Sequence, residues 1–495
     1  MSLTIQQTAA FSSGPSSNLD PSKVLLDTRS KTGLIRLTLV SLFFVIGCVF
    51  VKVPFTALIV FAYIVFIKVR YRLETPDLLA VWLVAAPFLG PYTAVHIANG
   101  IPDINFGRLF AILLLMSAFS AREGGRIRLF TNGLDYSLLL FVAACLISIF
   151  GSFMIRTPLR LFIDALLIPC GYYFVAKKCA TRSDFLPKLF LGSVLAVLAL
   201  SSLGVYETFT DRDVLQWYDV PEDTEEFRIN GPFGQASEFG LVLIMLLLFI
   251  WRMQSLREGN LLRRWRVAGA ILLGVVAVFG TKTRGIWLAL AAGWLLLHFR
   301  RRPFRCVGAL GLAVIVWLVL EQAILPQVFG QFWQNRIAQK KTVYARIATY
   351  QSALAMFEDH PVLGIGFGNF SEAWERYPER YFFQYEGMDS VSQPHNIFLS
   401  VLCEMGLVGG IAFITFQIQI LRKGLQITRT SRDKLRANYG EVATAIGLAF
   451  IVGGLGMNFT YNVGYLTKIY FLFLGIISGT LDSPEPAPAR IPEAL

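Results

Sequence analysis

Apolar residues recur along nearly the whole chain in runs of about 17–20 residues, separated by shorter polar and charged stretches. A helix of that length crosses the hydrocarbon core of a bilayer. The pattern predicts fourteen membrane spans, at residues 34–51, 53–69, 77–98, 105–120, 134–152, 159–176, 186–206, 236–251, 267–281, 285–299, 306–325, 395–421, 441–460 and 465–481. The first two spans are the least clearly divided, because only Lys52 and Pro54 separate them.

The composition agrees with this interpretation. The 495 residues are 55% hydrophobic, with a mean hydropathy of +0.57, so we expect an all-α polytopic membrane protein. The net charge of +12 arises from residues between apolar runs, which is typical of topology signals and not of a nucleic-acid-binding surface. The six cysteines lack metal-ligand spacing, and none lies in the long polar loops, so no disulfide framework is expected.

Basic residues are distributed unevenly between the two alternating sets of loops. One set, together with the two ends of the chain, contains 30 of the 45 Lys and Arg residues, although the other set includes the two longest loops. By the positive-inside rule, the first set and both termini face the cytoplasm. The predicted organisation is a disordered tail at 1–33, eleven spans at 34–325, a large outer loop at 326–394, three spans at 395–481 and a disordered tail at 482–495.

The large outer loop contains one segment with helical spacing. Apolar residues recur at steps of four and three positions, at Val343, Ile347, Tyr350, Leu354 and Phe357. The spacing predicts an amphipathic helix at about 340–358 that lies on the membrane or caps the bundle. Arg346 lies beside this stripe, where it can contact a phosphate or simply extend to the membrane surface. The glycines that follow, Gly364-Ile-Gly-Phe-Gly368, predict a tight turn and not a dinucleotide site.

The same loop ends in Ser392-Gln-Pro-His-Asn396, which runs directly into an apolar span. His395 therefore lies where a long polar segment enters the membrane. An imidazole in that place can accept a proton near neutral pH. A histidine at a helix end can also do no more than hydrogen-bond backbone or water, so the residue alone leaves both roles open.

Two other outer segments contain cations. Arg228 precedes Ile-Asn-Gly-Pro-Phe-Gly, a turn that is expected to hold it near the membrane surface. Lys282 and Arg284 lie in a short outer turn, where the positive-inside rule disfavours them unless an anion binds. Asp211 and Asp213 have the spacing of a D-x-D metal motif, but a solvated acidic loop is the expected state, and no metal site is predicted.

Roughly residues 200–475 resemble the superfamily of O-antigen ligases and O-antigen (polysaccharide) polymerases, which are bacterial integral membrane glycosyltransferases. The resemblance depends on four segments in order: Arg228-Ile-Asn-Gly-Pro-Phe-Gly, Thr283-Arg-Gly, Arg346 with the sequence through Gly368, and His395-Asn-Ile-Phe-Leu followed by Glu404-Met-Gly. It implies a GT-C-like fold of twelve to fourteen transmembrane helices in the inner membrane, with the loop 326–394 in the periplasm. It also implies that Arg228 and Arg346 face the donor diphosphate, that His395 is the essential histidine, and that Arg284 is a further diphosphate-binding position.

The reaction implied by the resemblance transfers a glycan from a polyprenyl diphosphate, such as undecaprenyl diphosphate, without metal, nucleotide or cofactor. The implied partners are that donor, a glycan or lipid acceptor, membrane lipids and other polysaccharide assembly proteins. The chemistry suits the residues. Arginine can form two hydrogen bonds to the phosphate oxygens on which charge develops, and His395 can take the proton of the acceptor hydroxyl.

Three functions are compatible with these features. The span count and the large outer loop favour a polymerase of O-antigen or exopolysaccharide, which extends a lipid-linked chain. A ligase that moves finished glycan to lipid A core or another acceptor is the alternative. A transporter or flippase of lipid-linked sugars would need buried charges within spans in both halves of the bundle, and Asp164 and Glu404 are the main candidates.

Overall fold

The structure is a computed structural model that describes residues 56–89, 105–120, 129–152, 155–210, 228–254, 261–299, 340–374, 376–377, 393–458 and 464–483. Every regular element in these ranges is helical. The elements are α3 (Thr56–Tyr71), α4 (Thr75–Leu89), α5 (Phe106–Phe119), α6 (Gly133–Phe150), α7 (Arg156–Phe162), the π-helical segment η3 (Ile163–Leu167), α8 (Ile168–Cys179), α9 (Phe185–Thr210), α10 (Ala236–Gln254), α11 (Leu261–Gly280), α12 (Arg284–Phe299), α16 (Lys340–Asp359), α17 (Phe370–Trp374), α19 (Ile397–Thr430), α20 (Lys434–Gly454) and α21 (Tyr465–Asp482).

Five of the described helical segments are long and apolar enough to cross a bilayer: Gly133–Phe150, Thr157–Cys179, Phe185–Thr210, Ala236–Gln254 and Ile397–Thr430. Four shorter apolar helices accompany them, at Thr75–Leu89, Phe106–Phe119, Trp265–Gly280 and Arg284–His298. Large apolar side chains such as Phe150, Phe209 and Ile411 are exposed on these helices, which suits a surface in lipid and not one in water. The protein is therefore a helical, multi-pass membrane protein.

Twelve of the fourteen predicted spans overlap a described helix, and the other two, 34–51 and 306–325, lie outside the described residues. The largest differences are at the ends of two helices. α19 continues to Thr430, and α20 begins at Lys434, where the Asp433 carboxylate accepts a hydrogen bond from the Leu435 amide at 3.0 Å. Both extensions are polar, so a search for apolar runs cannot detect them.

Close helix packing depends on small residues. Gly475 and Gly479 are four positions apart on α21 and face α8. A Cβ atom at Gly475 would lie 2.1 Å from the Tyr173 carbonyl oxygen, and one at Gly479 would lie 2.2 Å from that of Lys177. This is the small-residue spacing that lets transmembrane helices approach each other closely.

Lys177 on α8 is a buried cation in a polar cluster. Its Nζ atom lies 2.7 Å from a carboxylate oxygen of Asp135 on α6 and 3.0 Å from one of Asp482 on α21. The Tyr173 hydroxyl donates to the other Asp135 oxygen at 2.6 Å. The cluster therefore joins three helices through charges that satisfy one another.

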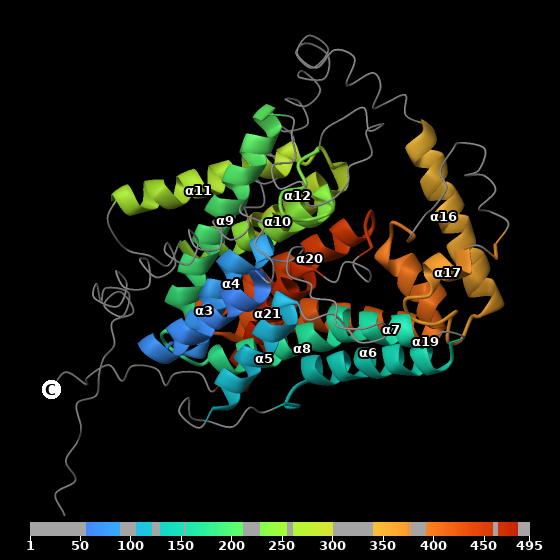
Figure 1. Ribbon diagram of the computed structural model, residues 1–495, viewed down its shortest axis with the longest axis horizontal. Helices are drawn as coiled ribbons and strands as arrows, with labels where there is room; N and C mark the ends of the chain where they lie inside the picture. Colours follow the sequence, from blue (N-terminus) through green and yellow to red (C-terminus); the bar gives the residue numbers. More distant parts are fainter. Residues whose placement is uncertain are drawn as a thin grey trace, which may run out of the picture.

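Figure 1 shows α16 and α17 together at one edge of the molecule, beside α19 and the end of α6 and far from α3 and α11. α16 occupies Lys340–Asp359, the range for which the apolar spacing predicts a helix. It packs on α19 with a face of small side chains, and Ala348, Thr349, Ser352, Ala353 and Met356 are buried there. Of the predicted stripe, Ile347 and Leu354 are exposed and Tyr350 and Phe357 are half-buried, so the buried face of α16 lies beside the stripe and not on it.

α19 is broken at Gly406, whose φ and ψ of 61° and −158° are not helical. The turn after α16 supplies the missing hydrogen bonds. The Ile365 and Gly366 amides donate to the Cys403 and Glu404 carbonyl oxygens at 3.0 and 2.9 Å. In the other direction, the Leu407 and Val408 amides donate to the Pro361 and Val362 carbonyl oxygens at 2.8 and 3.2 Å. We call this pairing of residues 361–366 with 403–408 the clasp.

We expect Gly406→Ala to lower stability, because alanine cannot adopt the backbone conformation of Gly406 without strain of about 1–3 kcal/mol. Its Cβ atom would also lie 2.4 Å from the Val362 carbonyl carbon, so the clasp must separate. The control is Gly410→Ala, since a Cβ atom at Gly410 meets only the Leu402 side chain, at 3.5 Å. Thermal unfolding of the purified protein in detergent measures both variants. An unfolding midpoint for Gly406→Ala equal to that of Gly410→Ala would contradict the role of the break.

Candidate functional site

The first turn of α19 is fixed by Asn396, directly after His395. The Asn396 side-chain oxygen accepts hydrogen bonds from the Phe398 and Leu399 amides at 2.9 and 3.2 Å, so Asn396 caps the helix. One turn further on, the Asn458 side chain donates to the Ser400 hydroxyl at 2.5 Å. These contacts hold the backbone on which His395 sits, and His395 itself is exposed.

α16 brings Arg346 to His395. The Tyr350 hydroxyl, one turn beyond Arg346, reaches the His395 carbonyl oxygen at 3.5 Å, which is a long contact. Arg346 is exposed, and its charge acts on the His395 imidazole. The two residues come from segments 49 positions apart in the sequence, and the packing of α16 on α19 makes them neighbours.

The pKa of His395 is lowered from its ordinary value of 6.5. The larger cause is desolvation by the protein around the ring, although the residue as a whole is exposed, and the smaller cause is the positive charge of Arg346. Both disfavour the imidazolium ion. At pH 7 the imidazole is therefore neutral, and one ring nitrogen can accept a proton.

The predicted tight turn at Gly364–Gly368 begins within the clasp and continues two residues beyond it. Gly364, Gly366 and Gly368 all have positive φ angles. A Cβ atom at Gly364 would lie 2.2 Å from the Glu404 carbonyl carbon, so only glycine permits this approach. Ser148 on α6 joins the same point, because its hydroxyl donates to the Glu404 carbonyl oxygen at 2.8 Å and accepts from the Phe367 amide at 3.0 Å.

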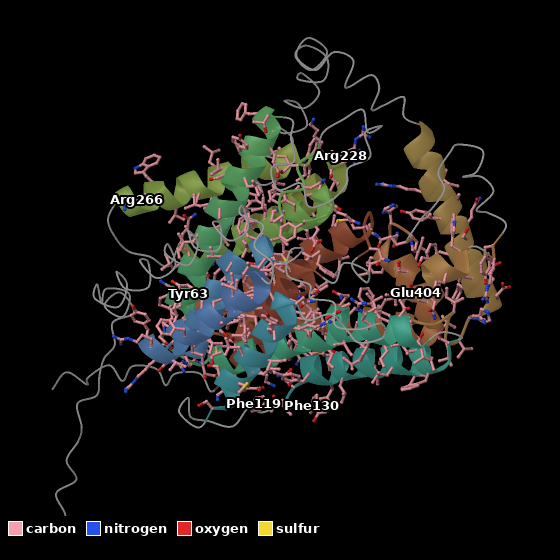
Figure 2. The ribbon with its side chains drawn as sticks, viewed as in Figure 1. Tyr63, Phe119, Phe130, Arg228, Arg266 and Glu404 are labelled. Carbon is pink, nitrogen blue, oxygen red and sulfur yellow. The ribbon has the colours of Figure 1, made fainter. Side chains whose placement is uncertain are left out.

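Arg228 and Arg284 lie on other elements. Arg228 is half-buried in the turn before α10, where the Gly231 amide donates to the Glu207 carboxylate at 3.0 Å, and Arg284 is exposed at the first position of α12. Figure 2 labels Arg228 near the top of the view and Glu404 lower down, where α19 meets α17. The structure thus brings Arg346 to His395, while the convergence of Arg228 and Arg284 on this pair stays a prediction.

Asp164 and Glu404, the two buried charges that a transporter could use, each make a contact within the bundle. The guanidinium of Arg108 on α5 donates from Nε to the Asp164 carboxylate at 2.7 Å, so Asp164 is part of an ion pair inside the π-helical segment. Glu404 is buried, and its carboxylate accepts from the Phe370 amide at 3.3 Å. In the sequence, Glu404 is a charge within a predicted span and the start of the Glu404-Met-Gly segment of the resemblance, and neither pattern predicts its contact with Phe370. A further signal is Gly406, two residues later, which breaks that span.

Among the residues that the structure describes, no three His, Cys, Asp or Glu side chains are grouped closely enough to hold a metal ion. Asp211 and Asp213 lie outside those residues. In the part of the chain that the structure describes, the candidate site thus consists of the neutral imidazole of His395 beside the guanidinium of Arg346, at the start of α19.

The fold and the site geometry thus define a helical membrane protein with an imidazole and a guanidinium at the start of a membrane helix. Residues 269–414 match the family model of O-antigen ligase. The match includes Arg284, Arg346, His395 and Glu404 but begins after Arg228, and it confirms the resemblance to the O-antigen ligase and polymerase superfamily. No curated protein matches the chain.

We expect His395 to react with diethylpyrocarbonate, which modifies neutral imidazole, at a pH lower than that for an ordinary histidine. Removing the charge in Arg346→Gln should raise the pKa of His395, because one of the two causes of its depression is gone. The reaction midpoint then moves to higher pH but stays below the ordinary value, since desolvation remains. Mass spectrometry of the peptide that contains His395 gives the midpoint. An unchanged midpoint in Arg346→Gln would show that the two residues do not interact.

Proposed function

We propose that this protein is a periplasm-facing glycosyltransferase that uses a polyprenyl-diphosphate-linked oligosaccharide as donor. The observation that carries the proposal is the proximity of Arg346 and His395 within the segment that matches the O-antigen ligase family. The proposal includes the predicted topology of about fourteen spans, with cytoplasmic termini and the 326–394 loop in the periplasm, in the bacterial inner membrane.

In the proposed reaction, the acceptor hydroxyl attacks the anomeric carbon of the donor sugar, and the bond from that carbon to the diphosphate oxygen breaks. His395 accepts the hydroxyl proton, which its lowered pKa permits at neutral pH. Negative charge grows on the diphosphate as it leaves. Arg346 stabilises that charge, with Arg228 and Arg284 as further proposed diphosphate-binding residues.

The proposed reaction needs no metal ion, nucleotide or other cofactor. In enzymes that transfer from a diphosphate, a divalent cation commonly offsets the charge of the leaving group. A guanidinium can do the same and can also form two parallel hydrogen bonds to phosphate oxygens. Metal independence is therefore a consequence of assigning the diphosphate to arginines, and it stands or falls with that assignment.

A polysaccharide polymerase is the preferred form of this function, and the large periplasmic loop supports it because a growing lipid-linked chain is a bulky acceptor. A ligase that transfers glycan to lipid A core or to another acceptor is the second form, supported by the description of the matching family. Both forms use the same donor and the same residues, so they differ only in what enters as acceptor.

His395→Ala should reduce the rate of glycan transfer by about 10²–10⁴-fold, the usual range for loss of a general base. Arg346→Ala should weaken both donor binding and rate, and Arg346→Lys should recover only part, because lysine cannot form the paired hydrogen bonds of a guanidinium. The matched control is His360→Ala, an exposed histidine just beyond the end of α16. Steady-state kinetics with lipid-linked donor measure all four variants. Wild-type rates in a folded His395→Ala protein would remove the catalytic assignment.

Deletion of the gene distinguishes the two forms of the function. Loss of a polymerase should leave surface glycan as single repeat units, because no enzyme extends them. Loss of a ligase should leave full-length glycan on its lipid carrier, unattached to an acceptor. Gel electrophoresis of extracted glycolipids separates these outcomes, and an unaltered glycan pattern in the deletion strain would contradict both. Complementation with the wild-type chain and with His395→Ala provides the control.

A further inference from the structure

Glu404 is a carboxylate in an apolar place. It is the eighth residue of α19 and is fully buried, with a relative exposure of 0%. Burying a carboxylate costs free energy that its hydrogen bonds rarely recover in full. An apolar side chain at this position would fill the same space without that cost, so a carboxylate here implies a use other than packing.

The side chain and the backbone of Glu404 hold the same loop from two sides. The carboxylate accepts the Phe370 amide, the first residue of α17, at 3.3 Å. The backbone carbonyl oxygen accepts the Gly366 amide at 2.9 Å and the Ser148 hydroxyl at 2.8 Å. The loop between Gly366 and Phe370 is therefore attached to Glu404 at both of its ends.

A short connection joins this loop to the C-terminal end of α16. Four residues separate Asp359, the last residue of α16, from Gly364, and the clasp begins among them at Pro361. The α17 residues Phe370 and Trp374 pack in one buried cluster with Ala353 and Met356 of α16 and Cys403 of α19. Attachment of the loop to Glu404 thus fixes both the end of α16 and the surface on which it packs.

A small change in the direction of α16 at its C-terminal end produces a large displacement at Arg346. Arg346 lies 13 residues before Asp359 on a continuous helix, a distance of roughly 20 Å. A small tilt or rotation of α16 at the clasp therefore displaces the guanidinium relative to His395 by a much greater amount. A displacement of about 1 Å at a reacting centre can reduce the rate about 100-fold.

We infer that Glu404 is a positioning residue, which holds the loop 366–370 and thereby sets α16 so that Arg346 faces His395. The inference rests on the proposed function for the roles of Arg346 and His395. What Glu404 supplies is a hydrogen-bond acceptor at the Phe370 amide, and its negative charge is not required. Glutamine offers the same acceptor in nearly the same shape, whereas alanine offers none.

The test compares Glu404→Gln with Glu404→Ala. The control is Glu372→Ala, which removes an exposed carboxylate of α17 from the same neighbourhood. Nitroxide labels on p-acetylphenylalanine at positions 354 and 414 report the position of α16 on α19, because Leu354 and Ile414 are exposed residues of these two helices. Pulsed electron spin resonance gives the distance distribution, and steady-state kinetics give kcat and KM for the lipid-linked donor.

Glu404→Ala should broaden or shift the distance distribution and lower kcat about 10- to 100-fold. Glu404→Gln and Glu372→Ala should keep a narrow distribution and a rate within a few-fold of the wild type. If Glu404→Gln is as inactive as Glu404→Ala while its distribution stays narrow, the charge itself is needed and the inference is wrong. An unaltered distribution in Glu404→Ala would also overturn it.

A second variant covers the case in which Glu404→Ala does not fold. Ser148→Ala removes the hydroxyl that donates to the Glu404 carbonyl oxygen and accepts from the Phe367 amide, so it should shift the same distribution by a smaller amount. An unaltered distribution in this variant contradicts the inference. The distance measurement needs no substrate. If the wild-type protein transfers no glycan, the proposed function fails, while the distances still decide whether Glu404 positions α16.

Discussion

A helix that breaks inside a membrane bundle must find other partners for its freed backbone groups, because lipid offers none. The break of α19 at Gly406 meets this requirement with a second segment of chain. Residues 361–366 lie against the break and exchange four backbone hydrogen bonds with residues 403–408. The connection that follows α16 is thus drawn into the bundle, and the N-terminal part of α19 and α16 become a single unit.

The position of the candidate site follows from that unit. His395 is placed by the cap of α19, through Asn396, and Arg346 is placed by α16, through the clasp and the small-residue face that packs on α19. Both placements depend on backbone geometry and on close packing. Neither depends on an ion pair between the two residues, which carry the wrong charges for one. A cation can therefore be held beside an imidazole without any attraction between them.

The sequence predicted much of the fold, because helices in a bilayer show as apolar runs of the right length. It also predicted the helix at α16 and identified His395 at a helix start, since both have local signals: a spacing of three and four residues, and a Pro-His-Asn sequence before an apolar run. The clasp has no such signal. Gly364 and Gly406 are 42 positions apart, and each alone indicates only a turn or a weak point in a helix. Their pairing exists only in three dimensions, and so do the burial of Glu404 and the choice of which face of α16 packs.

The charges around the candidate site suit the proposed reaction better than the opposite arrangement would. A carboxylate beside Arg346 would neutralise the guanidinium and compete with a diphosphate for its hydrogen bonds. A neutral imidazole does neither, and the guanidinium in turn helps to keep that imidazole neutral. Glu404 is the one carboxylate in the stretch of α19 between His395 and the break, and its side chain is directed to the Phe370 amide. The hydrogen bond that anchors the loop thus engages the Glu404 carboxylate inside the bundle, so that, among the residues that the structure describes, Glu404 does not compete with an anion for the Arg346 guanidinium.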